Sequence, residues 1–438
     1  MLIKFIDTHR QFLLKILNLL PKRIQDKVKI FYREKILHAI YRKVRNIELS
    51  NTVFEDGKYI ISKLSGSTLK NGVNLIGFPT GEFGLGQHIR NVADALNVAS
   101  IDYSFYDCSY LFMGNYDDTS VIDKISKELP YKTNIFVCNG DAIAKLYLEY
   151  GNKIFSGRYN IHYGAWELRD YPTEWISTLA IFDEYWAMSS FLQKSVSDSA
   201  MIPVIHMPYP IDFEIPKGYK RKDFNLPEDK FLYIFTFDMS SIMARKNPKA
   251  VIEAFYKAFP DETKVGLVIK VIRNKNYQIL KEELDNLMKN LVGDKRIYLI
   301  DEVLPREKIL ALINLCDVYV SLHRAEGLGI GMAEAMKMGK VVIATNYSGN
   351  TDFTLNNNSC VVDYKLVPLK PLEYIYESGK YWAEPSIEQA SKYMKKLFED
   401  KEYYTILAKS GEKYIDEHYS VNTVQKKYVS RLKLLGLI

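Results

Sequence analysis

The stretch Ser321-Leu-His-Arg-Ala-Glu-Gly-Leu-Gly-Ile-Gly-Met-Ala-Glu-Ala-Met336 decides the interpretation of the sequence. An apolar run, Val318 to Leu322, is typical of a buried strand, and a glycine-rich loop leads from it into a helix that Gly339 can end. Backbone N–H groups at such a helix N-terminus stabilise phosphate, while Glu326 and Glu334 can accept hydrogen bonds from hydroxyls. The stretch therefore predicts a nucleotide-sugar site. An ordinary turn, with Glu334 on a solvated helix face, would show the same spacing.

Short apolar runs alternate with helical periods from residue 66 onward, which predicts doubly wound α/β domains with mainly parallel sheets. The expected strands are 73–78, 103–106, 134–138, 159–163, 184–188 and 203–207 in the first half, and 231–237, 265–272, 297–300, 318–322 and 341–345 in the second. The proline-rich segment 208–216 is typical of a linker. Two domains joined there would face each other across a cleft at the carboxyl ends of their strands.

Composition places the chain among soluble globular proteins, since 47% of its 438 residues are hydrophobic and 26% are charged. The four cysteines, Cys108, Cys138, Cys316 and Cys360, have neither paired nor metal-like spacing. Three of them lie in or beside apolar runs, which favours buried, reduced thiols in a cytoplasmic protein.

The positive charge is concentrated at the start of the chain. Residues 1–46 hold 12 Lys or Arg and 3 Asp or Glu, a balance of +9, so a total of +6 leaves −3 for the rest. This distribution excludes a generally basic, nucleic-acid-binding protein. Apolar residues recur at helical spacing in 12–20 and 30–41, which predicts two basic amphipathic helices, too short in apolar length to span a bilayer. They would either contact an anionic membrane peripherally through residues 1–50 or pack on protein.

The first half contains a second glycine-rich loop, Pro79-Thr-Gly-Glu-Phe-Gly-Leu-Gly-Gln-His-Ile-Arg90, directly after an expected strand. Gly84 and Gly86 would let the backbone approach a ligand before a helix that begins near Gln87. Ile89 stands where a dinucleotide fingerprint counted from Gly84 needs Gly or Ala, which argues against a Rossmann oxidoreductase. A tight turn without a ligand is the alternative.

Cationic side chains follow two expected strands of the second half. Arg245 and Lys246 precede Pro248, which is well tolerated in a first helical turn, and they could neutralise a diphosphate leaving group. Basic residues at a helix N-terminus oppose the macrodipole, so stability alone would not place them there, although a solvated pair of surface residues is the alternative. Lys270, within an apolar run, is either an edge-strand charge or a second phosphate contact.

A third group of candidates follows the expected strand at 159–163. His162 and Glu167 are candidate polar groups, and Trp166 could offer an apolar face for sugar stacking. A lone His or Trp is as often a core residue. No Asp-x-Asp occurs in the chain, so a diphosphate bridged by a metal on paired aspartates is not supported and no metal is expected.

Taken together, residues 70–435 resemble glycosyltransferase family 4, and within it a subgroup of bacterial polysaccharide assembly. The most specific part is the glutamate pair with its loop and Gly339-Lys-Val-Val-Ile-Ala-Thr345. Three further segments reinforce the resemblance: Arg245-Lys-Asn-Pro248, Gly84-Leu-Gly86, and Trp166-Glu167 with Asp183-Glu-Tyr-Trp-Ala-Met-Ser189.

The resemblance implies the GT-B fold, in which two doubly wound Rossmann-like domains face a cleft. We expect an N-terminal helical extension at 1–66, an acceptor-side domain at 67–212, a nucleotide-sugar donor domain at 213–415, and a helix at 416–438 that crosses back to the first domain. It also implies a retaining hexosyltransferase that needs no metal or other cofactor. The enzyme would move a hexose from a nucleotide-diphosphate sugar to a hydroxyl of a growing or lipid-linked glycan, in O-antigen, lipopolysaccharide or capsule.

The resemblance also implies roles for single positions. Glu326 would bind donor-sugar hydroxyls, with the N–H groups of Gly327 and Leu328 near the sugar, and Glu334 would hold the ribose. Lys246 would neutralise the diphosphate, assisted by the loops at Gly84–Gly86 and Ser348–Gly349.

Two positions depart from the family pattern. Ser241 stands where an arginine is usual, so Arg245 or Lys270 would compensate, and Ser348-Gly349 replaces a double glycine. The alternatives are a sugar-nucleotide epimerase or phosphorylase on the same fold, or a silent nucleotide-sugar-binding subunit.

Overall fold

The structure is a computed structural model that describes residues 21, 24, 52–55, 58–61, 64, 67–112, 114–272, 278–289, 291 and 293–438. The two amphipathic helices expected at 12–20 and 30–41 lie outside these residues, and the alternative between membrane and protein contact stays open. Within the described part of the chain, no helix is long and apolar enough to cross a membrane.

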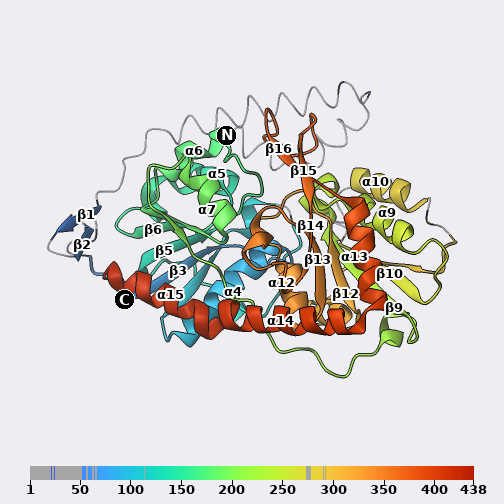
Figure 1. The fold of residues 1–438 in the computed structure, drawn as a ribbon. Coiled ribbons are helices and arrows are strands. Elements are labelled where there is room, and N and C mark those ends of the chain that lie inside the picture. The colour runs from blue at the N-terminus through green and yellow to red at the C-terminus, as the bar shows by residue number, and fades with distance from the viewer. Residues whose placement is uncertain are drawn as a thin grey trace.

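The first domain is built on a six-stranded parallel sheet with the order β4-β3-β5-β6-β7-β8. Its strands are β3 (Lys70–Gly77), β4 (Tyr103–Asp107), β5 (Tyr131–Val137), β6 (Tyr159–His162), β7 (Glu184–Ala187) and β8 (Val204–His206). Every strand expected in the first half is present. The sheet is covered by α4 (Gly84–Val98), α5 (Gly140–Tyr150), α6 (Thr173–Leu179) and α7 (Ser190–Ser197), with α5 and α6 above it and α4 below it in Figure 1.

A second six-stranded parallel sheet, with the order β11-β10-β9-β12-β13-β14, forms the other domain. Its strands are β9 (Phe231–Asp238), β10 (Val265–Ile272), β11 (Ile297–Asp301), β12 (Val318–Ser321), β13 (Val341–Thr345) and β14 (Cys360–Val362). The helices α8 (Met243–Lys246), α9 (Pro248–Ala258), α10 (Gln278–Lys289), α11 (Arg306–Leu315), α12 (Ile330–Lys337) and α13 (Ile387–Glu399) follow or connect these strands. The doubly wound α/β prediction is confirmed for both halves.

Three pieces of β structure were not expected from the sequence. They are β14, the antiparallel hairpin of β15 (Tyr364–Pro368) and β16 (Tyr381–Pro385), and the antiparallel pair β1 (Thr52–Glu55) and β2 (Lys58–Ile61). β14 has three residues, which is too few for a periodic signal, and β15 is largely exposed, so it has no apolar face to reveal it.

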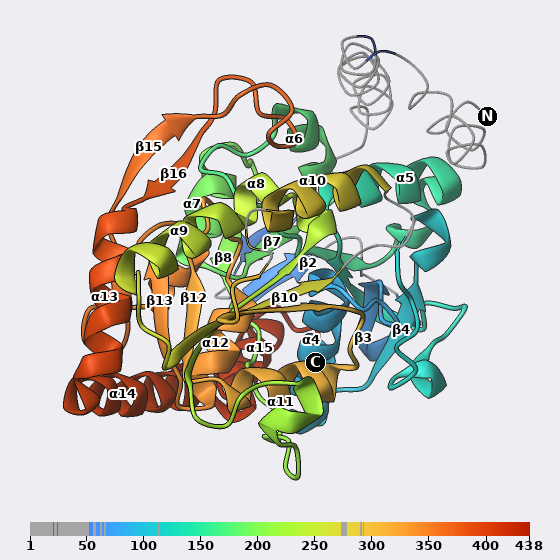
Figure 2. The ribbon, with the colours of Figure 1, turned by 90° about the vertical axis from the view of Figure 1, so that its right-hand side faces the viewer.

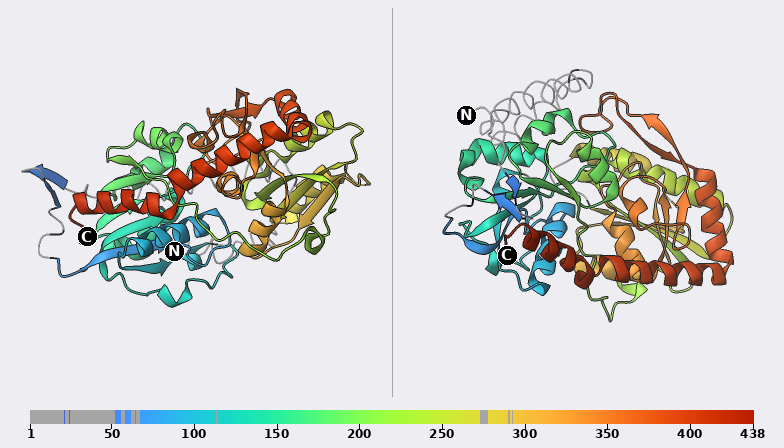
Figure 3. Two further views of the ribbon diagram at one scale, coloured as in Figure 1. Left: turned by 60° about the horizontal axis from the view of Figure 1, so that its bottom comes forward. Right: turned by 60° about the vertical axis from the view of Figure 1, so that its left-hand side comes forward.

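The last two helices run from the second domain back to the first. α14 (Lys401–Tyr419) packs against α12, and α15 (Val421–Leu434) packs against α4, so the pair lies along both domains (Figures 1 and 3). Arg431 of α15 reaches the fully buried Glu184 of β7, with 2.5 Å between Nη2 and Oε2. The chain end is therefore anchored by charge as well as by packing.

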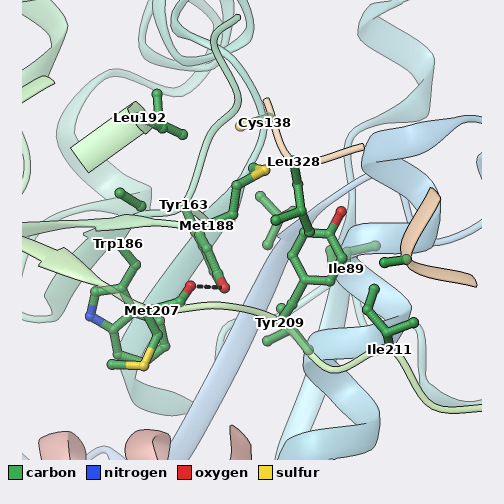
Figure 4. Packing of buried hydrophobic residues seen from close by; sticks show 14 of the residues in the cluster. Ile89, Cys138, Tyr163, Trp186, Met188, Leu192, Met207, Tyr209, Ile211 and Leu328 are labelled. Atoms are coloured by element: carbon green, nitrogen blue, oxygen red, sulfur yellow. Dashed lines mark hydrogen bonds between the residues drawn. The ribbon is translucent and has the colours of Figure 1, made fainter. Parts of the chain in front are cut away.

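The two domains also share a hydrophobic core. Leu328, from the loop after β12, packs among first-domain side chains that include Met188 and Tyr209 (Figure 4). In the same cluster the Tyr163 hydroxyl donates to the carbonyl of Met207. The four cysteines are buried and free, as the sequence predicts.

Candidate functional site

Two adjoining cavities lie between the domains, at the carboxyl ends of both sheets. The Arg306 compartment, of about 250 Å³, is lined by Asp238 and Ser321 at the ends of β9 and β12 and by Arg306. The Tyr374 compartment, of about 460 Å³, is lined by side chains of both domains, among them Tyr374. Both are lined by Lys246 and Glu326, so they are parts of one cleft. This is where open α/β sheets bind ligands.

Glu326 and Lys246 form an ion pair at the junction of the two compartments. Lys246 Nζ lies 2.5 Å from Glu326 Oε1, and Arg245 Nη1 lies 3.2 Å from Glu326 Oε2. All three side chains are mostly buried. Burial alone would raise the pKa of Glu326, but Lys246 and Arg245 outweigh it and lower the pKa to about 2. Glu326 is therefore an anion at neutral pH, held between two cations.

The loop that carries Glu326 is held from behind by the segment after β13. The Glu326 N–H donates to Ser348 Oγ at 2.8 Å, and the Gly349 N–H donates to the Glu326 carbonyl at 3.0 Å. A Cβ at Gly349 would meet the carbonyl oxygen of Gly327 at 1.9 Å, so only glycine permits this approach. Ser348 and Gly349 line neither compartment. The structure thus gives them a supporting position behind the loop, and the donor contact that the resemblance implies stays a prediction.

The first domain adds a contact to the same loop. Ser189 Oγ, at the N-cap of α7, donates to the Gly327 carbonyl at 2.7 Å. Gly327 and Leu328 line the Tyr374 compartment, so the loop is fixed by both domains where it faces the cavity.

Glu334 lies on α12, in the wall of the Arg306 compartment, and its side chain is 3% exposed. Arg306 Nη2 is 2.5 Å from Glu334 Oε1. Arg306 was not among the expected site residues. It begins α11 directly after Pro305, where a basic residue opposes the helix dipole, so the argument applied to Lys246 would have identified it.

Lys270 lies in β10, which is hydrogen-bonded to β11 on one side and β9 on the other. The reading of Lys270 as an edge-strand charge is therefore wrong. Its Nζ donates to the carbonyls of Val271, at 2.8 Å, and Glu302, and the side chain lines the Arg306 compartment. Burial lowers the pKa of Lys270 to about 8.

Gly84 and Gly86 have different surroundings. Gly84 lines both compartments, at the first turn of α4. Gly86 lines neither, and a Cβ there would meet the Gly81 carbonyl oxygen at 2.1 Å. Gly86 lets the helix pack against its own preceding turn. Arg90, missed by the sequence reasoning, donates to the carbonyls of Pro79 and Gly81 and also lines the Arg306 compartment.

Two candidates of the first domain are core residues. His162 is 1% exposed, bonds through Nε2 to the Cys138 carbonyl at 2.8 Å, and stacks on Phe182. Burial lowers the pKa of His162 to about 4, so the ring is neutral. Trp166 is 0% exposed and packs edge-on against Trp175. The rings of His162 and Trp166 therefore do not line the cleft. The expected stacking face of Trp166 is therefore not available.

Glu167 does line the Tyr374 compartment. It accepts a hydrogen bond from the Tyr374 hydroxyl at 2.5 Å and lies 3.9 Å from Arg245 Nη2. In the described part of the chain, no group of three His, Cys, Asp or Glu side chains could hold a metal ion. Metal independence stays a prediction.

Comparison with known proteins agrees with this architecture. Residues 217–414 match the family model described as glycosyl transferases group 1. A sequence search of curated proteins finds no match. Among solved structures, sucrose-phosphate synthase of Thermosynechococcus elongatus is 13% identical with a TM-score of 0.60, over 84% of this chain and 99% of that chain.

Two further structures are similar. HepE of Anabaena, in complex with UDP and glucose, is 13% identical with a TM-score of 0.58, over 83% of this chain and all of that chain. TarM is 13% identical with a TM-score of 0.50 over 68% of this chain, which spans only 54% of the length of TarM. At this identity the likeness shows the fold, which is that of the GT-B glycosyltransferases. Together with the family-model match, it supports a glycosyltransferase.

Proposed function

We propose that the chain is a retaining glycosyltransferase of family 4 that transfers a hexose from a nucleotide-diphosphate sugar to a hydroxyl of a glycan. One observation carries the proposal: Glu326 is held as an anion by Lys246 and Arg245 where the two compartments meet. A donor that spans the junction brings its sugar to a carboxylate and its diphosphate to a cation.

The nucleotide occupies the Arg306 compartment in this proposal. Glu334 accepts hydrogen bonds from the ribose hydroxyls, while Lys246 and Lys270 lie where a diphosphate needs positive charge. Of the two residues that could replace the usual arginine at Ser241, Lys270 lines this compartment and Arg245 lines the other. Lys270 is therefore the better candidate for the second phosphate contact.

The sugar then lies in the Tyr374 compartment, against Gly327 and Leu328, with its hydroxyls on Glu326. The acceptor hydroxyl attacks the anomeric carbon from the face that the nucleotide leaves, and the departing phosphate takes the proton. No protein nucleophile is needed, and the main contribution of the protein is charge on the leaving group. Engagement of the diphosphate by Lys246 replaces part of the ion pair that Lys246 makes with Glu326.

The acceptor is proposed to be a growing or lipid-linked glycan of a bacterial surface polysaccharide, O-antigen or capsule. Support comes from the sequence resemblance to polysaccharide-assembly enzymes. The enzyme would work in the cytoplasm, with peripheral membrane contact through residues 1–50. Deletion of residues 1–50 should abolish vesicle binding and leave transfer to a soluble acceptor intact; loss of folding would favour the packing alternative.

The proposal is tested by nucleotide release and glycoside formation. UDP-, GDP- and dTDP-sugars are first screened for thermal stabilisation, and the donor that stabilises is then assayed. We expect Glu326→Ala to lose at least about a hundredfold in transfer, the scale of a lost transition-state contact. A change under about threefold would defeat the site assignment. Turnover without an acceptor glycan would favour the epimerase or phosphorylase, and binding without turnover the silent subunit.

A further inference from the structure

A segment of the second domain closes one side of the Tyr374 compartment. We call residues 369–380, which join β15 to β16, the strap. It reaches the first domain near α6 (Figure 2), where Tyr376 lies 5.7 Å from the ring of Trp175. Leu372 and Tyr376 have φ of 71° and 51°, in a region that costs non-glycine residues energy. Hydrogen bonds within the strap, such as that from the Leu372 N–H to Glu377 at 3.0 Å, and contacts to the first domain hold it in this shape.

Two tyrosine hydroxyls attach the strap to the first domain. Tyr374 donates to Glu167 at 2.5 Å, and Tyr376 donates to Asp141 at 2.8 Å. Both rings are at least nine-tenths buried. The strap thus carries two similar interdomain hydrogen bonds, each from a tyrosine to a carboxylate.

The two tyrosines differ in what else they touch. The Tyr374 ring lies 5.9 Å from the Arg245 guanidinium, and Arg245 in turn lies 3.9 Å from Glu167 and 3.2 Å from Glu326. Tyr374 is therefore linked to Glu326 through Arg245, both directly by its ring and by way of Glu167. Tyr374 and Ile375 line the compartment, whereas Tyr376 does not.

We propose, on the basis of the function above, that Tyr374 is a positioning residue that fixes Glu326 through Glu167 and Arg245. Tyr374 and Ile375 together form a wall of the compartment that leaves room for the acceptor sugar and excludes water. Without the Tyr374 hydroxyl, Glu167 is free to pair more closely with Arg245. The ion pair between Arg245 and Glu326 is then weaker, and Glu326 moves relative to the sugar. A displacement of this kind slows the chemical step more than it weakens nucleotide binding.

Excluding water matters because the donor sugar can react either with the acceptor hydroxyl or with water. In transfer, the acceptor oxygen bonds to the anomeric carbon as the bond to the diphosphate breaks, and the phosphate takes the proton. In hydrolysis, water supplies the oxygen and proton instead. A looser wall favours water, which is small and abundant. The ratio of hydrolysis to transfer therefore reports on the wall itself.

The strap supplies its own matched control. Tyr374→Phe and Tyr376→Phe each remove one hydroxyl and with it the hydrogen bond to a first-domain carboxylate. We expect Tyr374→Phe to lower kcat for transfer about tenfold, to change KM for the donor less than about threefold, and to raise the hydrolysis-to-transfer ratio at least about threefold. Tyr376→Phe should stay within about twofold of wild type in all three, since its ring lies outside the compartment.

Two further variants keep the test decisive if Tyr374→Phe does not fold. Glu167→Gln keeps an acceptor for the hydroxyl but removes the charge beside Arg245, and should reproduce the loss in kcat. Ile375→Ala keeps both hydroxyls and opens the wall, and should raise the hydrolysis-to-transfer ratio with little change in donor KM. Equal effects of Tyr374→Phe and Tyr376→Phe would overturn the inference, because they would give the strap a structural role only. Failure of wild type to consume any nucleotide sugar would instead overturn the proposed function.

Discussion

Glu326→Gln should destabilise the empty protein and enlarge the stabilising effect of a nucleoside diphosphate. The substitution keeps the shape of the side chain but removes the anion between Lys246 and Arg245, whose side chains are only 19% and 5% exposed. Breaking a buried pair by removing one partner costs about 3–5 kcal/mol, because the remaining charges stay desolvated. At about 2–4 °C per kcal/mol for a domain of this size, we expect the Tm of the second domain to fall by about 10 °C.

The measurement is thermal unfolding at pH 7 with and without UDP, whose diphosphate supplies the missing negative charge beside Lys246. In wild type the diphosphate competes with Glu326 for that lysine, whereas in the variant it does not. The UDP-induced rise in Tm should therefore be larger in Glu326→Gln than in wild type. Neutral pH is the right condition: the lowered pKa of Glu326 means that its contribution to stability is present above its unfolded pKa of 4.5 and is lost as the pH falls towards 2.

Glu334→Gln is the matched control, since it also removes a buried carboxylate that pairs with an arginine, Arg306. Because Glu334 is proposed to hold the ribose, this variant should show a smaller UDP-induced rise than wild type. The reasoning is refuted if Glu326→Gln unfolds within about 2 °C of wild type, or if both variants change the UDP effect in the same direction.

Three more predictions concern single positions. Gly349→Ala should lower transfer at least about tenfold, because its Cβ would meet the Gly327 carbonyl at 1.9 Å and displace the loop; kinetics at wild-type level would contradict this. The pKa of His162 is about 4 in the folded state and 6.5 in the unfolded state. As the pH falls from 6.5 to 4, the unfolded state takes up the proton first, so the free energy of unfolding drops by about 3 kcal/mol. Denaturant titrations at several pH values should find this dependence of the unfolding free energy on pH reduced in His162→Leu. Arg431→Met should lower the free energy of unfolding by about 3 kcal/mol, measured in urea, because it leaves the fully buried Glu184 carboxylate without its charged partner.

Much of the fold followed from periodicity alone. Inner strands such as β12 (Val318–Ser321) and β13 (Val341–Thr345) are buried on both faces, and apolar runs of this kind are visible without knowledge of their neighbours. The strap and the hairpin of β15 and β16 that carries it were not predicted, because the exposed β15 has no buried face. The function of the strap depends on contacts with Glu167 and Asp141, more than 200 residues away, which no local pattern encodes.

Part of the cleft lining could be predicted from the sequence. Lys246 was identified because a cation before the expected helix at Pro248 would oppose the helix dipole, and it does line the cleft. The premise was wrong, since Lys246 is the last residue of α8, where a cation is compatible with the dipole. His162 and Trp166 could not be resolved in the same way. A strand-end position is compatible with the core or the cleft, and the choice depends on the Cys138 carbonyl and on the packing of Trp175.

The most direct test of the account is a crystal structure with the nucleotide sugar that stabilises the protein best. The account predicts the ribose hydroxyls within hydrogen-bond distance of Glu334, the diphosphate at Lys246, and the sugar against Glu326 and Leu328. A nucleotide bound elsewhere on the molecule, with the ion pair between Glu326 and Lys246 unchanged, would contradict it.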